Sequence, residues 1–100
     1  MAHDRETIKI AGQSWTIIFY PRREIKHPAG DKVLGWCDLP GQTIHVAEAM
    51  GKRKFPHVCH HELTHAVDAV MDEVDADIRG MAHAELADVL TARKARKAKE

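Results

Sequence analysis

Residues 56–71, PHVCHHELTHAVDAVM, are the stretch on which the expected fold depends. Apolar side chains recur in it at the spacing of one helix face, and no glycine occurs between Gly51 and Gly80. The apolar positions are Val58, Leu63, Ala66, Val67 and Val70. Pro56 is tolerated because the first turn of a helix leaves its N–H groups unpaired. The pattern predicts a helix from about Pro56 to about Met71.

The chain before this helix has the pattern of β-strands. Residues 7–10 and 15–20 are rich in β-branched and aromatic side chains, and residues 11–14 between them offer a turn, so we expect a β-hairpin. Residues 32–38 resume a strand-like run, and residues 42–46 alternate polar and apolar side chains as a half-buried strand does. Together these segments predict a sheet of three or four strands.

A second helix is expected after residues 72–75, which contain candidate N-cap residues. One face of it is marked by Ile78, Met81, Ala82, Glu85, Leu86 and Val89. Residues 92–100 are basic and lack large apolar side chains, so we expect this tail to fray into solvent. Strands followed by helices give an α+β fold, and residues 1–100 form a single domain without an internal repeat or linker.

Composition excludes several classes of protein. The 100 residues include 15 basic and 15 acidic side chains, and this balance argues against a surface built for nucleic acid. No apolar run approaches the roughly 20 residues that span a bilayer, so we expect a soluble protein without membrane partners. The first residues resemble no secretory signal, and the 2 cysteines are too few for a disulfide framework. We therefore expect reduced thiols and a cytoplasmic location.

The residues with the clearest chemical meaning are His61-Glu62-Leu63-Thr64-His65, an H-E-x-x-H motif. Residues four apart on a helix stand one turn apart on the same face, so the imidazoles of His61 and His65 can reach one tetrahedral Zn²⁺ ion. Glu62 is offset by about 100° from His61 and can reach a water held by that metal. The motif predicts Glu62 as the general base in hydrolysis of a carbonyl compound.

The motif and its surroundings resemble the gluzincin-type zinc metallopeptidases, in particular the minigluzincins and short phage-encoded H-E-x-x-H metallopeptidases. Residues 35–38 and 42–46, followed by residues 61–68, look like the strands and active-site helix of that family. The resemblance implies a small twisted sheet packed against the motif helix and a second C-terminal helix. It also implies hydrolysis of peptide bonds in a peptide or protein substrate.

In that family an extended peptide pairs with the edge strand of the sheet across the cleft. The resemblance assigns this edge to residues 42–46, so Thr43, Ile44 and His45 are the expected substrate-binding residues.

The third metal ligand is left open by the sequence. Gluzincins take an acidic residue from the following helix as the third ligand. Asp75 resembles the acidic residue in a pattern of the phage proteins, which have glutamate at that position. Glu85 follows His65 at the spacing of thermolysin-like enzymes. Helix lengths favour Asp75 or Asp77, because an antiparallel second helix returns to the level of His65 within about six residues of the turn. Water alone is the remaining alternative.

Two other interpretations compete with a peptidase. The chain could be a zinc-stabilised binding or regulatory module without proteolytic activity, although such a module has no need of Glu62 beside the metal. The chain could also be a plain helical domain with an accidental motif, since its 8 histidines raise the chance of such a match. The sequence does not specify the oligomeric state.

Overall fold

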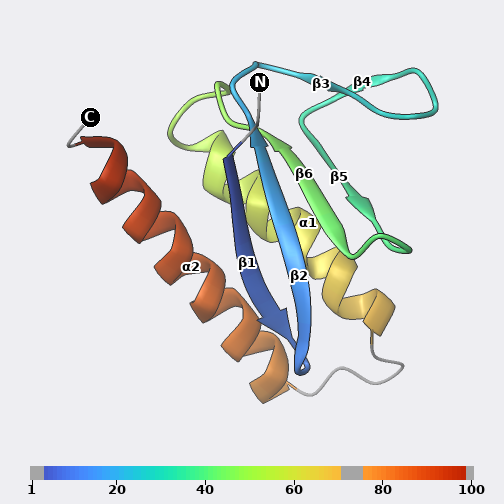
Figure 1. Ribbon diagram of the computed structural model, residues 1–100, viewed down its shortest axis with the longest axis vertical. Coiled ribbons are helices and arrows are strands. Elements are labelled where there is room, and N and C mark those ends of the chain that lie inside the picture. The colour runs from blue at the N-terminus through green and yellow to red at the C-terminus, as the bar shows by residue number, and fades with distance from the viewer. Residues whose placement is uncertain (1–3, 71–75, 99–100) are drawn as a thin grey trace.

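The computed structural model describes residues 4–70 and 76–98, without the side chains of residues 70 and 76–79. Its elements, in chain order, are β1 (Asp4–Ile10), β2 (Gln13–Tyr20), β3 (Ile25–Lys26), β4 (Lys32–Val33), β5 (Gly35–Asp38), β6 (Thr43–Ala47), α1 (Lys54–Val70) and α2 (Ala76–Ala98). The predicted α+β class is confirmed. Figure 1 shows β1, β2, β6 and β5 side by side, with α1 behind them and α2 alongside β1.

The main sheet has four strands in the order β1-β2-β6-β5, and β3 and β4 form a separate two-stranded sheet. The predicted hairpin is confirmed, since β1 and β2 pair antiparallel around a loop of Ala11 and Gly12. Both loop residues have positive φ, at 51° and 81°, as a type I′ turn requires, and Gly12 adopts such an angle without steric cost.

The edge strand differs from the prediction. Strand β6 lies inside the sheet, parallel to β2 on one side and antiparallel to β5 on the other, so the expectation that residues 42–46 form the edge is wrong. The chain runs through β5 first and then turns back to place β6 against β2. Strand β5 therefore occupies the edge, and no strand in the described part of the chain pairs with its outer side.

Both helices cover the same face of the main sheet (Figure 1). Apolar side chains of β1, β2 and β6 meet those of α1 and α2 in one core, because alternate residues of each strand point to that face. The large buried members include Ile8, Trp15, Phe19, Ile44, Leu63 and Leu86. Neither helix, over the residues described, is long and apolar enough to cross a membrane.

The basic end of the chain is ordered helix, contrary to the expectation of fraying from residue 92. Helix α2 continues to Ala98, and Arg93 is only 3% exposed. Its guanidinium donates hydrogen bonds to Glu48 at 2.7–3.1 Å and to Asp4 at 2.8 Å, and lies 4.2 Å from the centre of the Phe19 ring. These contacts replace the large apolar side chains that the tail lacks.

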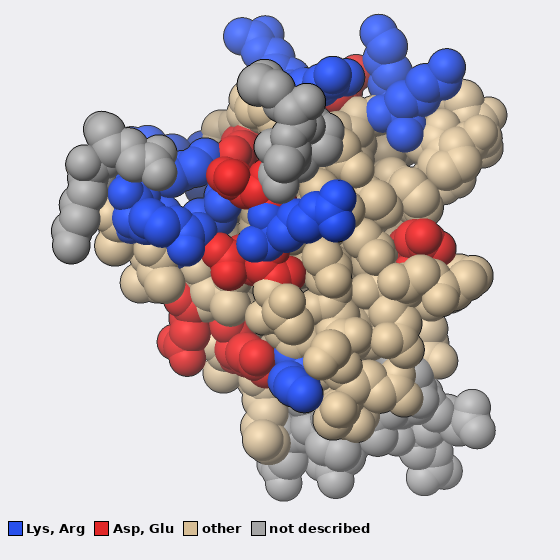
Figure 2. Space-filling view, viewed as in Figure 1, with Lys and Arg blue, Asp and Glu red and all other residues tan. Residues whose placement is uncertain are grey.

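Further ion pairs join this end of α2 to the rest of the molecule. Arg96 lies 2.6 Å from Glu6, and Lys97 lies 2.6 Å from Glu48. Figure 2 shows blue and red side chains interleaved over this region. The arrangement favours a structural role for these cations, which hold the end of α2 against β1 and the segment after β6.

Candidate metal centre

His61 and His65 project from α1 into solvent, and their rings converge. Their Nε2 atoms lie 3.2 Å apart, with the ring planes at 84°. Two imidazole nitrogens that bind one tetrahedral zinc ion at about 2.0–2.1 Å stand about 3.3 Å from each other. The observed separation fits this geometry, and both side chains are exposed, so a metal could reach the two nitrogens from solvent.

Glu62 lies beside this pair but points toward the sheet. Its side chain is 8% exposed and lies against Gly35 of β5. Burial raises the pKa of the Glu62 carboxyl, while the positive charge that His61 and His65 can carry opposes the rise. A carboxylate with a raised pKa is a better proton acceptor than an exposed one, as a general base requires.

Gly35 is the reason that α1 approaches β5 so closely. A Cβ atom at this position would lie 3.0 Å from Cγ1 of Val58, 3.1 Å from Cγ of Glu62 and 3.1 Å from the carbonyl oxygen of His45. Only glycine fits between these groups without displacing them. The backbone of β5 consequently passes directly alongside Glu62.

Cys37, two residues further along β5, faces the same space. Burial raises the pKa of its thiol to about 11, and the negative charges of Glu62 and Asp38 contribute to the rise. The thiol is therefore neutral at physiological pH and is a poor nucleophile there. Its role beside Glu62 is to form an uncharged wall of the site.

The third ligand is not visible among the described side chains. Asp75 lies outside the described residues, and Asp77 lies in α2 at a position whose side chain is not described. Glu85 is not brought to the histidines, because its Oε1 accepts a hydrogen bond from the backbone N–H of Lys9 on β1 at 3.1 Å. Over residues 4–69 and 80–98, no three His, Cys, Asp or Glu side chains are arranged to hold a metal ion.

The residues expected to bind a peptide are occupied within the sheet. Ile44 has no exposed surface and belongs to the core. His45 is half-buried on the opposite face, where its ring stacks on Trp36 at 4.2 Å and its Nδ1 shares a 2.8 Å hydrogen bond with the Tyr20 hydroxyl. The Thr43 hydroxyl donates a hydrogen bond to the carbonyl oxygen of Gly41. Since β6 has a partner on each side, its backbone cannot pair with a peptide.

A second histidine pair lies between the helices, which the sequence did not predict. His60 of α1 and His83 of α2 stack at 4.8 Å, with their Nδ1 atoms 2.6 Å apart. Burial, followed by the charge that His83 can carry, lowers the pKa of His60. No local signal identifies this pair, because its members are 23 residues apart and meet only through the packing of the helices.

Comparison with protein-family models, with curated proteins and with solved structures found no match to this chain. The chemistry of the site is accordingly drawn from its own residues. These are two solvent-facing imidazoles with converging Nε2 atoms, and a buried carboxylate between them in sequence, adjacent to an open strand edge.

Proposed function

We propose that this protein is a zinc-dependent peptidase of the gluzincin type, in which His61 and His65 hold the metal and Glu62 is the general base. The observation that carries the proposal is the 3.2 Å separation of the two Nε2 atoms. That distance fits two ligands of one tetrahedral zinc, and the residue between them in the motif is a buried glutamate with a raised pKa.

A zinc ion at this position would supply a positive charge that acidifies water and polarises a carbonyl group. Glu62 takes the proton from the attacking water and gives it to the nitrogen of the leaving amine. Burial raises the pKa of the Glu62 carboxyl, which suits a group that must accept a proton. The positive charge that His61 and His65 can carry opposes this rise, so the carboxyl can also release the proton. The third metal ligand that we propose is Asp75 or Asp77.

We place the substrate along β5 in preference to β6. The outer side of β5 has no strand partner among the described residues, so its N–H and C=O groups are free to pair with an extended peptide. Gly35 brings this strand to within contact distance of Glu62. A peptide added at this edge would run past the carboxylate that acts as the base.

The test combines zinc content with cleavage of an unstructured peptide mixture, followed by mass spectrometry. The wild type is expected to bind one zinc per chain and to cleave peptides. Glu62→Gln keeps the metal but loses cleavage by at least about 100-fold, because general-base catalysis contributes about 10²–10⁴-fold. His57→Ala changes an exposed histidine of the same helix outside the motif and leaves both properties intact.

Two results would contradict the proposal. A wild type that binds no zinc at micromolar metal would show that the motif is accidental. A wild type that binds zinc but cleaves no peptide, with Glu62→Gln indistinguishable from it, would favour a zinc-stabilised binding module.

A further inference from the structure

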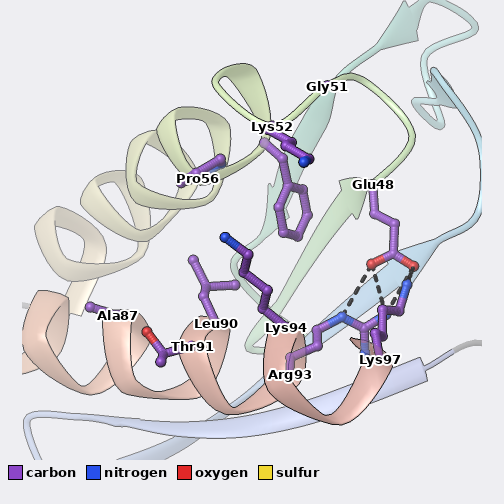
Figure 3. A pocket seen from close by; sticks show the side chains of 11 residues that line it. Glu48, Gly51, Lys52, Pro56, Ala87, Leu90, Thr91, Arg93, Lys94 and Lys97 are labelled. Carbon is purple, nitrogen blue, oxygen red and sulfur yellow. Dashed lines mark hydrogen bonds and ion pairs between the residues drawn. The ribbon is translucent and has the colours of Figure 1, made fainter. Parts of the chain in front are cut away.

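A pocket of about 560 Å³ opens between the start of α1 and the C-terminal half of α2. Figure 3 shows side chains from both helices around it. None of His61, Glu62 and His65 lines this pocket, so it is separate from the candidate metal centre. Its volume lies within the range of about 300–1,000 Å³ that is usual for small-molecule sites.

The floor of the pocket is apolar. Phe55 and Leu90 are partly buried and pack against the core, and Pro56 and Ala87 extend the same surface. The Phe55 ring packs against Phe19 at 5.8 Å between centroids, which fixes it in place. An apolar group that entered here would be removed from water against a surface that is already formed.

One end of the pocket is closed by charges that satisfy one another. Arg93 and Lys97 both bind Glu48 (Figure 3), and Arg93 also binds Asp4. The buried guanidinium therefore needs no ligand. This end forms a rigid and electrically compensated wall.

Lys52 and Lys94 are the two cations of the pocket that differ from this pattern. Lys52 precedes α1 and Lys94 belongs to α2, so they stand on opposite sides, and Figure 3 shows the Lys94 side chain reaching from α2 toward α1. Neither ammonium group has an ion pair or hydrogen bond with the described residues. The first turn of α1 carries no acidic residue, so the positive end of that helix adds to their charge.

We propose that this pocket binds a small amphipathic carboxylate, free in solution, with its apolar body on Phe55 and Leu90 and its carboxylate between Lys52 and Lys94. An anionic group complements the two uncompensated ammonium groups, and an apolar chain complements the floor between them. A neutral ligand leaves the cations unpaired, and a cationic ligand is repelled by both. The inference is independent of the peptidase proposal.

The experiment uses decanoate as the probe, with isothermal calorimetry on the full chain. Decanoate is expected to bind saturably with one site per chain. 1-Decanol, which has the same chain without the charge, binds about tenfold more weakly or less, and decylamine binds more weakly still. The His61→Ala variant binds decanoate as the wild type does, which separates this site from the metal centre.

Lys52→Glu and Lys94→Glu each weaken decanoate binding by about tenfold. Lys32→Glu, an identical charge change at an exposed lysine of β4 outside the pocket, weakens it by less than about twofold. Ala87→Trp fills the pocket from an exposed helix position and abolishes binding, while circular dichroism reports whether the fold is intact.

Four outcomes would overturn the proposal. Decanoate could fail to saturate at millimolar concentration, decylamine could bind as tightly as decanoate, or all three lysine reversals could have equal effects. A fourth is that anionic phosphatidylglycerol vesicles are bound through Lys52 and Lys94 while monomeric decanoate is not. That result would assign the lysines to a membrane surface in place of a soluble ligand.

Discussion

Two histidine pairs begin at adjacent residues of α1 and differ in almost every property. His61 and His65 lie on one helix and are exposed, with Nε2 atoms 3.2 Å apart. His60 and His83 join two helices and are half-buried and stacked, with Nδ1 atoms 2.6 Å apart. The first separation suits two ligands of a tetrahedral metal as well as a hydrogen bond, whereas the second is too short for two ligands and suits only a hydrogen bond between the rings.

Adjacent residues of a helix are rotated by about 100°, and this one step separates a side chain that faces solvent from one that packs between the helices. The residue at position 61 faces solvent and can accept a metal. The residue at position 60 faces α2 and holds the helices together.

Removing one imidazole of the exposed pair should nearly abolish metal binding. His61→Ala and His65→Ala are each expected to weaken zinc affinity by more than about 100-fold, since loss of a direct ligand exceeds the 10–100-fold cost of losing a supporting group. Competition with a chromophoric chelator measures this affinity. His60→Ala is the matched control and should change it by less than about threefold. Equal losses at positions 60 and 61 would show that the two pairs do not have distinct roles.

Removing one imidazole of the half-buried pair should affect stability instead. His83→Ala is expected to lower the free energy of unfolding by about 1 kcal/mol, because the hydrogen bond to His60 and the ring stacking are lost. For a domain of this size the melting temperature falls by about 4–8 °C. Thermal unfolding of the metal-free chain measures the change, with His57→Ala as control. If His83→Ala kept its stability but lost zinc binding, the half-buried pair would be the metal site.

The half-buried pair should also make stability depend on pH. The pKa of His60 is lowered from 6.5, so the unfolded chain binds a proton more readily than the folded one as the pH falls through this range. The stability that neutral His60 contributes is complete above about pH 6.5 and is lost as the pH falls through the folded pKa. Urea unfolding between pH 7.5 and 5 measures it. The free energy of unfolding should change less steeply with pH in His83→Ala than in the wild type. An unchanged pH dependence would show that another group causes it.

Glu62 should show the opposite dependence in the metal-free chain. Its folded pKa is raised from 4.5, so the ionised carboxylate costs stability as the pH rises through the folded pKa. Glu62→Gln is therefore expected to unfold at a slightly higher temperature than the wild type at pH 7, and at the same temperature below about pH 4. Measurement in the presence of a chelator excludes metal effects. A variant less stable at pH 7 would show that the carboxylate has a stabilising partner.

The sequence was informative wherever the pattern is local. The hairpin follows from β-branched runs on either side of a short turn, and the span of α1 from helical periodicity without glycine, because both depend on residues close together in the chain. The Nε2 separation of His61 and His65 is equally local, since helix geometry sets it. Glu62 could be identified from the motif alone, but its burial against Gly35 could not.

The sequence did not reveal contacts between residues that are far apart in the chain. Alternation in residues 42–46 fits an edge or an interior strand equally well, and the parallel pairing with β2 decided between them. The basic tail lacked the apolar face that marks a packed helix. Arg93 is nevertheless buried through Asp4 and Glu48, which lie 89 and 45 residues away. Such contacts have no signature in local composition.

Long-range ¹H–¹⁵N spectra of the histidine rings test whether His61 and His65 form the metal site while His60 and His83 do not. These spectra are recorded with and without one equivalent of zinc. We expect large shifts at Nε2 of His61 and His65 and unchanged Nδ1 signals at His60 and His83. Unchanged Nε2 signals at His61 and His65, or metal-induced shifts at His60 and His83, would contradict it.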